Sequence, residues 1–323
     1  MSDTLLEIKN LSKTFDVRKG VLRRSSEKIR AVSNVSLSLQ RGETLALVGE
    51  SGCGKSTLGK TLLQLSGSYE GEVLFSGTEL SNLTTQQLRT LRQDMQIIFQ
   101  DPMESLNSRH TVGQILREPL DIHKLGKPEE RDRRVDELLA LVGLNKDCLS
   151  RFPHEFSGGQ RQRIGIARAI ALEPKFIVCD EPVSALDVSI QSQIINLLLE
   201  LQNKLNLTLL FISHDLSVVR HIADRVAVMY LGEIVELGTA EELFNSPRHP
   251  YTRALLDAIP VPDPTLRRGR PALLGDVPSV TNPPSGCCFH PRCVYADDSC
   301  KNTKPALEKT TNGEIRCLHW QVL

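Results

Sequence analysis

The sequence has few aromatic residues and no excess of charge of either sign. Aromatic residues make up 4% of the 323 residues, and 39 basic residues balance 39 acidic ones. Surfaces that bind nucleic acid usually carry an excess of basic residues and aromatic rings on which bases stack. The composition therefore argues against a nucleic-acid-binding protein and against broad electrostatic binding to an anionic membrane.

Long hydrophobic runs are also missing. A membrane-spanning helix needs about 20 apolar residues, whereas the apolar stretch from Ile194 to Leu201 is short and ends among polar residues. The N-terminal residues Met1–Thr4 lack the basic head and apolar core of a secretory signal. We therefore expect a cytosolic protein whose eight cysteines are thiols or metal ligands rather than disulfides.

One glycine-rich segment stands out in what is present. Residues 49–57 follow an apolar run at 45–48 and precede a helix-prone segment at 58–65. This is the strand–turn–helix setting of a phosphate-binding loop, in which Lys55 reaches the β- and γ-phosphates and Ser56 binds Mg²⁺. The segment predicts a nucleoside triphosphate site formed by Gly49, Glu50, Ser51, Gly52, Cys53, Gly54, Lys55, Ser56 and Thr57.

A second segment supplies carboxylates. The run Phe176–Cys179 predicts a buried strand, and Asp180 and Glu181 come at its C-terminal end. We expect Asp180 to hold Mg²⁺, directly or through a water, and Glu181 to accept a proton from the attacking water. An acidic turn at a strand end is common without any function, but its place downstream of a phosphate-binding loop favours catalysis.

These segments, with several others in a fixed order, resemble the ATP-binding cassette (ABC) ATPases. The resemblance extends over about residues 5–240, and one position departs from it, because Phe156 stands where most members have leucine. The matching stations are the loop at 49–57, Gln100, the signature at 156–160, the acidic strand at 176–181, Ser184–Asp187 and Ser213–Asp215.

The resemblance implies that ATP, with Mg²⁺, is bound between two cassettes that face each other head to tail. Each ATP then lies between the 49–57 loop of one cassette and the signature of the other, Ser157, Gly158, Gly159 and Gln160. It also implies that Gln100 contacts Mg²⁺ or the attacking water and relays to a transmembrane partner, that His214 hydrogen-bonds the γ-phosphate, and that Asp187 shapes the dimer contact. Phe15 is the candidate for stacking on adenine, although an aromatic residue at a strand end is more often part of the core.

Further stretches resemble the oligopeptide/dipeptide branch of ABC importers. They are Phe99–Arg109, in which Ser108 replaces the usual proline, the long insertion between Phe15 and Ala31, and His249–Leu256. The resemblance implies a second, paralogous ATPase subunit, two transmembrane permease subunits and an extracytoplasmic peptide-binding protein, with this chain peripheral at the cytoplasmic face of the inner membrane. Import of nickel, glutathione or a cell-wall peptide stays open as an alternative, as does a soluble ABC ATPase outside transport.

The C-terminal tail is rich in cysteine. Cys287, Cys293, Cys300 and Cys317 are separated by five, six and sixteen residues, and Cys288 is an extra thiol. Four thiolates suit an iron–sulfur cluster or zinc equally well in charge and number, and the long spacings favour iron–sulfur. Some members of the branch bind a [4Fe-4S] cluster there. His290 and His319 are alternative ligands, and a reduced tail without metal is the third interpretation.

The order of elements predicts an α/β fold. We expect a mixed sheet around the phosphate-binding loop, a small antiparallel sheet from the early strands, and a helical subdomain at about residues 88–172. Residues 16–30 are expected to form an exposed excursion. The ATPase domain is predicted at 1–245 and a C-terminal extension at 246–323, in which the prolines at 260, 262, 264, 271, 278, 283 and 284 mark an extended connector.

Overall fold

The computed structural model describes residues 3–18, 26–259, 275–311 and 313–322. Contacts divide the chain into two compact units. The first consists of Met1–Leu6, Leu39–Thr44 and Phe75–Ile212, and the second of Glu7–Ser38, Leu45–Leu74 and Ser213–Leu323. These units do not coincide with the division at residue 245, which stays a prediction.

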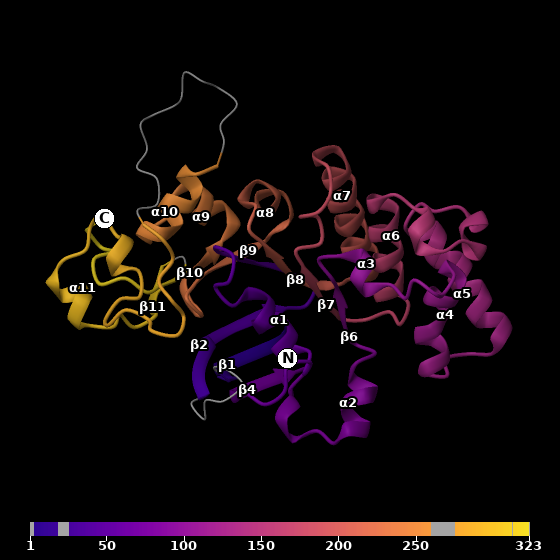
Figure 1. The fold of residues 1–323 in the computed structure, drawn as a ribbon, viewed down its shortest axis with the longest axis horizontal. Helices are drawn as coiled ribbons and strands as arrows, with labels where there is room; N and C mark the ends of the chain where they lie inside the picture. Colours follow the sequence, from indigo (N-terminus) through magenta and orange to yellow (C-terminus); the bar gives the residue numbers. More distant parts are fainter. Residues whose placement is uncertain (1–2, 19–25, 260–274, 312, 323) are drawn as a thin grey trace. The chain divides into compact units, whose positions relative to one another are not determined.

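The first unit combines parallel strands with most of the longer helices (Figure 1). The strands β6, β7 and β8 pair in parallel, with Met95 opposite Phe176 and Phe176 opposite Thr208. Its main elements are β5 (Thr78–Glu79), α2 (Thr85–Leu91), β6 (Met95–Ile98), α3 (Pro102–Ser105), α4 (Val112–Ile122), α5 (Pro128–Leu141), α6 (Gly158–Ala169), β7 (Phe176–Asp180), α7 (Val188–Leu205) and β8 (Thr208–Ser213).

Local sequence explains where these elements begin and how they pack. Thr84, Thr111 and Ser157 cap α2, α4 and α6, each in a capping box with a glutamine three residues later. Every residue of β7 and β8 is buried, as expected for parallel strands covered on both faces. Helices α4, α5 and α6 contact one another, in the region where the sequence predicts a helical subdomain.

The second unit holds the early strands, the helix after the phosphate-binding loop and the C-terminal part of the chain (Figure 1). Its main elements are β1 (Thr4–Arg18), β2 (Ser26–Gln40), β3 (Thr44–Val48), α1 (Lys55–Leu62), β4 (Glu70–Phe75), α8 (Leu216–Ile222), β9 (Arg225–Tyr230), β10 (Glu233–Thr239), α9 (Ala240–Asn245), α10 (Pro250–Asp257), the 3₁₀ turn η5 (His290–Arg292), α11 (Asp298–Asn302), β11 (Glu308–Thr310) and β12 (Gly313–Ile315).

This unit contains a mixed sheet and an antiparallel pair, as predicted. Strand β3 runs parallel to β9, while β10 pairs antiparallel with β9 and with β12. In the other sheet β1 lies between β2 and β4. Hydrogen bonds from the Asn10 N–H to Ser36 Oγ and from the Asn34 N–H to Ser12 Oγ, 2.9 Å each, fit an antiparallel β1–β2 pair.

One predicted feature differs from the structure, and another lies partly outside the described residues. Residues 16–18 and 26–30, predicted as part of an exposed excursion, are strand instead, because β1 continues to Arg18 and β2 begins at Ser26. Pairing of the two strands accounts for the difference, since a polar sequence can form strand where a neighbour supplies hydrogen bonds. The connector prolines at 260, 262, 264 and 271 lie outside the described residues, whereas those at 278, 283 and 284 lie in a stretch without helix or strand.

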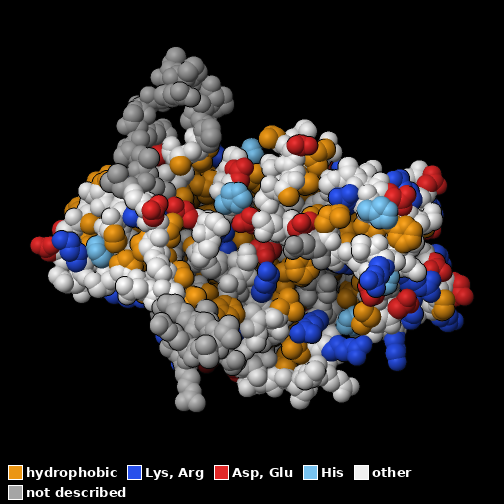
Figure 2. All heavy atoms as spheres, viewed as in Figure 1, with side chains coloured by type: hydrophobic (Ala, Val, Ile, Leu, Met, Phe, Trp, Pro, Cys, Tyr) orange, Lys and Arg blue, Asp and Glu red, His pale blue; other side chains and the backbone are white. Residues whose placement is uncertain are grey.

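Within the described part of the chain, no helix combines the length and apolar character needed to cross a membrane. On the face drawn in Figure 2, basic and acidic side chains are interspersed over the helices of the first unit. Ion pairs in this unit include Arg131–Asp121 at 2.6 Å and Lys146–Asp136 at 2.7 Å.

Candidate functional site

The phosphate-binding loop has the predicted strand–loop–helix setting in the second unit. It connects the buried strand β3 to α1, and it turns through positive φ angles at Gly49 (+152°) and Gly54 (+109°). A Cβ atom would lie 2.2 Å from the Met229 carbonyl oxygen at Gly49, and 2.1 Å from the Ala31 carbonyl oxygen at Gly54. Both positions therefore require glycine for backbone conformation and for space.

Lys55 is the charged centre of this loop. Its side chain is 4% exposed, and Nζ donates hydrogen bonds to the carbonyl oxygens of Gly49 at 2.7 Å and Glu50 at 2.9 Å. Burial raises the pKa of the Cys53 thiol, which keeps that side chain neutral beside the cation. The loop thus holds a positive charge and N–H groups at a helix start, an arrangement suited to anionic oxygens.

In the first unit, the ends of β6 and β7 bring Gln100 and Glu181 together. Ile98 lies opposite Cys179 in the parallel pair, and Gln100 Nε2 donates to Glu181 Oε2 at 3.2 Å. Asp180, the last residue of β7, is 4% exposed. Glu181 has a positive φ of +47°, which residues other than glycine rarely adopt. Residues in such backbone conformations cluster at functional sites.

The signature segment lies at the start of α6, also in the first unit. Ser157 is the N-cap, accepting from the Gln160 N–H at 3.4 Å while its own N–H donates to Gln160 Oε1 at 3.1 Å. A Cβ atom at Gly159 would lie 2.5 Å from Cγ2 of Ile190. Glycine therefore allows the start of α6 to approach α7, while Ser157 and Gly158 stay exposed.

The departure at Phe156 has a local explanation. Its ring is 3% exposed, and the Arg151 guanidinium lies 4.3 Å from the ring centroid. An arginine over an aromatic face is attractive, so the larger side chain gains a contact that leucine would not make.

The remaining predicted residues lie on exposed surfaces of their units. Asp187 is the N-cap of α7, and the next residue, Val188, is 78% exposed. His214 is exposed just after β8. The Phe15 ring is 38% exposed, and Lys13 Nζ lies 5.0 Å from its centroid. Phe15 is therefore not a core residue, although most aromatic residues at strand ends are. No adenine contact follows from exposure alone, and stacking stays a prediction.

The C-terminal cysteines are free thiols. Burial first, and then the neighbouring thiols Cys300, Cys317 and Cys293, raise the pKa of Cys287 to about 11. Burial also raises the pKa of Cys293 and Cys317, with a further contribution from Cys300. The Cys287 N–H donates to the Cys300 carbonyl oxygen at 2.8 Å, which places these two residues side by side.

One group of possible metal-ligand atoms includes a C-terminal cysteine. Among the described residues, Asp297, Cys300 and His319 place ligand atoms within 4.8 Å of one another. His319 Nε2 lies 3.2 Å from Asp297 Oδ2. The sequence indicated His319 as an alternative ligand, but it gave no reason to include Asp297.

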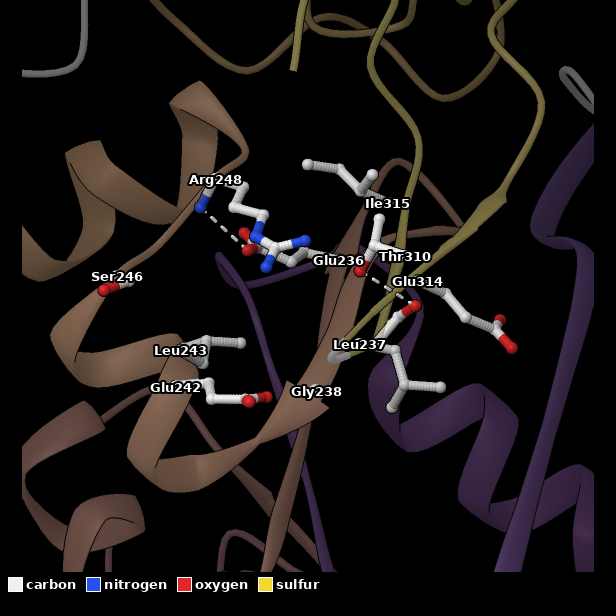
Figure 3. A pocket seen from close by; sticks show the side chains of 11 residues that line it. Glu236, Leu237, Gly238, Glu242, Leu243, Ser246, Arg248, Thr310, Glu314 and Ile315 are labelled. Atoms are coloured by element: carbon white, nitrogen blue, oxygen red, sulfur yellow. Dashed lines mark hydrogen bonds between the residues drawn. The ribbon is translucent and has the colours of Figure 1, made fainter. Parts of the chain in front are cut away.

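The lining of a pocket in the second unit includes none of the predicted site residues (Figure 3). It has a volume of about 200 Å³ and is lined by parts of β10, α9, β11 and β12. Its buried carboxylate, Glu236, accepts hydrogen bonds from the N–H groups of Arg248 at 2.8 Å and His249 at 3.0 Å.

Sequence reasoning missed two residues that contact the phosphate-binding loop. Tyr251 Oη accepts a hydrogen bond from the Glu50 N–H at 2.9 Å. Arg292 Nη1 and Nη2 lie 2.6 Å and 3.0 Å from the two oxygens of the Glu50 carboxylate. Tyr251 lies in the stretch His249–Leu256 that resembles the oligopeptide/dipeptide branch, so the sequence held a signal that could have indicated it. Arg292 lies in no sequence motif that could have indicated its contact with Glu50.

Family comparisons agree with the motifs in both parts of the chain. The family model described as ABC transporter matches residues 32–184. The one described as Oligopeptide/dipeptide transporter, C-terminal region, matches residues 235–300.

Curated relatives match along almost the whole chain. The oligopeptide transport ATP-binding protein AppF of Bacillus subtilis is 51% identical over 98% of this chain and 97% of that protein. The oligopeptide transport ATP-binding protein OppF of Escherichia coli is 50% identical over 97% of this chain and 96% of that protein.

Solved structures share the fold. The structure of cbiO1 of Clostridium perfringens, part of the ABC transporter complex cbiONQ, has a TM-score of 0.65 at 29% identity, covering 76% of this chain and 92% of that one. An ATP-binding cassette solved as a dimer in a post-hydrolysis state, bound to ADP and Pi, has a TM-score of 0.64 at 31% identity, covering 73% and 99%.

Proposed function

Because the chain belongs to the ATP-binding subunits of oligopeptide ABC transporters, we propose that it hydrolyses ATP to drive the import of di- or oligopeptides. The observation that carries the catalytic part is the hydrogen bond between Gln100 and Glu181 at the end of the strand that carries Asp180. Hydrolysis of the phosphoanhydride bond between the β- and γ-phosphates needs a group that accepts a proton from water and a group that orients the water.

We assign the predicted residues separate roles in ATP binding and hydrolysis. Lys55 and the N–H groups at the start of α1 bind the phosphates, and His214 donates a hydrogen bond to the γ-phosphate. Gln100 orients the attacking water, and Glu181 takes its proton. Ser56, Gln100 and Asp180 would hold Mg²⁺, which would neutralise charge on the phosphates. The oxygen and hydroxyl donors of these side chains suit such a hard cation.

We further propose that the active form contains two cassettes. The cassette that resembles this chain and was solved as a dimer supports this, as do the exposed Ser157 and Gly158 at a helix start. Near that signature, Asp187 offers an acidic contact and the strongly exposed Val188 offers an apolar one. On this proposal Ser157, Gly158, Gly159 and Gln160 face the ATP of a paralogous partner, and Phe15 stacks on the adenine of the chain's own ATP.

The other proposed partners are two transmembrane permease subunits and, through them, an extracytoplasmic peptide-binding protein, with this chain at the cytoplasmic face of the inner membrane. The relatives are described as oligopeptide transport ATP-binding proteins, which supports a role of this chain in a transport complex. The cargo is tested by titrating the binding protein of the same system with peptides of different lengths, and with glutathione and nickel as the alternatives. Preferential binding of peptides supports the proposal, and selective binding of glutathione or nickel contradicts it.

The C-terminal cysteines form a proposed metal centre. We propose that Cys287, Cys293, Cys300 and Cys317 hold an iron–sulfur cluster, because four thiolates suit such a cluster in charge and number. Zinc is the second candidate, favoured by the proximity of Asp297 and His319 to Cys300.

Anaerobic purification of two variants separates these candidates. If the centre is iron–sulfur, the wild-type protein should be brown with about four iron atoms per chain, Cys293→Ser should lose the iron, and His319→Ala should keep it. If the centre is zinc at Asp297, Cys300 and His319, the protein should be colourless and His319→Ala should lose zinc. A colourless wild-type protein without metal contradicts both.

A further inference from the structure

Glu50, the second residue of the phosphate-binding loop, is held from two C-terminal segments. Tyr251 of α10 accepts the Glu50 N–H at 2.9 Å, and Arg292 of η5 binds both carboxylate oxygens, at 2.6 Å and 3.0 Å. All three residues belong to the second unit. The Arg292 side chain is 4% exposed and that of Glu50 is 24% exposed, so the ion pair is shielded from water.

The groups that hold Glu50 are themselves fixed by packing. Tyr251 is 0% exposed, and its ring centroid lies 4.7 Å from that of Tyr230 and 5.3 Å from that of Phe289. The Tyr251 N–H donates to His249 Nδ1 at 3.1 Å, and burial lowers the pKa of His249 to about 3, so the imidazole is a neutral acceptor. The hydroxyl that meets the loop therefore has little freedom to move.

The Arg292 side chain starts from a short turn that is also well defined. The Arg292 N–H donates to the Phe289 carbonyl oxygen at 3.0 Å, and its guanidinium lies 5.9 Å from the centroid of Tyr230. A bidentate pair between arginine and a carboxylate is among the stronger and more directional contacts in proteins. The pair fixes the position of the Glu50 side chain and neutralises its charge.

Neutralisation matters because Glu50 lies in a loop that binds anions. An uncompensated carboxylate beside the phosphates would repel ATP, since like charges close together are costly where water is partly excluded. We infer that Arg292 and Tyr251 are positioning residues for ATP binding, which neutralise and orient Glu50 so that the phosphate-binding loop accepts the nucleotide. This inference rests on the proposed ATPase function, and it gives the C-terminal extension a part in the nucleotide site.

A double-mutant cycle tests the inference on the full-length chain. The dissociation constant for MgATP should rise roughly tenfold in Arg292→Gln, because the Glu50 charge is then unpaired. Adding Glu50→Gln to that variant should restore the dissociation constant to within about threefold of wild type, since no charge is left to repel the nucleotide. Arg292→Lys, which keeps the charge and loses the bidentate geometry, should lie in between.

A matched control and a kinetic measurement separate positioning from stability. Lys301→Gln removes a positive charge from the same region, at an exposed residue that pairs with Asp298, and should leave the dissociation constant unchanged. In the assembled transporter at saturating MgATP, kcat of Arg292→Gln should stay within about threefold of wild type, because the chemistry does not involve Arg292.

Two results would overturn the inference. One is an unchanged dissociation constant in Arg292→Gln, and the other is a double variant as impaired as Arg292→Gln alone. If Arg292→Gln does not fold, a wild-type dissociation constant for MgATP in Arg292→Lys would overturn the inference. A wild-type chain that binds no MgATP contradicts the proposed function instead, so the two failures are distinguishable.

Discussion

Replacing Glu181 with glutamine should abolish ATP hydrolysis while leaving ATP binding intact. Glutamine has nearly the same shape and can keep a hydrogen bond to Gln100, which lies 3.2 Å from the carboxylate oxygen. It cannot accept a proton from water, and loss of a general base typically lowers turnover about 10²–10⁴-fold. The measurements are phosphate release by the assembled transporter and the dissociation constant for MgATP of the full-length chain.

The matched control is Glu200→Gln, which removes an exposed carboxylate on α7 of the same unit. It should leave both turnover and binding at wild-type values. Turnover of Glu181→Gln at the wild-type rate would show that another group takes the proton. Loss of MgATP binding together with turnover would show that Glu181 acts in binding rather than in catalysis.

Replacing Gly54 with alanine should destabilise the second unit severely. At this position φ is +109°, and the new Cβ would lie 2.1 Å from the carbonyl oxygen of Ala31, a backbone atom that cannot move aside alone. Backbone strain and overpacking each cost about 1–3 kcal/mol, so we expect a loss of roughly 3–5 kcal/mol in the free energy of unfolding. Thermal and urea unfolding of the full-length chain measure it.

Gly52→Ala is the control for this prediction, because Gly52 lies in the same loop at φ +79° but a Cβ atom added there would have no other atom within 4 Å. Only the conformational strain remains at that position, so the expected loss is about 1 kcal/mol. Equal losses in the two variants would contradict the idea that close approach to Ala31 makes Gly54 indispensable.

Several parts of the site could be predicted because their signals are local in sequence. The glycines and Lys55 of residues 49–57 follow a buried strand and begin a helix, and the structure has that order. Asp180 and Glu181 end an apolar run that forms the buried strand β7. Short motifs of this kind carry their own conformational requirements, so they can be recognised without knowing what lies beside them.

The contacts of Glu50 could not be predicted, because they join residues far apart in the chain. Arg292 looks like any basic residue in a polar, cysteine-rich stretch, and only the fold brings it to a residue 242 positions away. The inclusion of Asp297 near Cys300 and His319 has the same origin. The length of β1 and β2 was underestimated because strand formation depends on a paired neighbour more than on the strand's own sequence.

The most direct test of the proposed function is ATP hydrolysis by the importer reconstituted from this chain, its partner ATPase, the permease subunits and the binding protein. Phosphate release should require Mg²⁺, rise when the binding protein carries peptide, and disappear with Glu181→Gln in this chain and its equivalent in the partner. Phosphate release that is absent, or that does not respond to peptide, would contradict the assignment of this chain as the ATPase of a peptide importer.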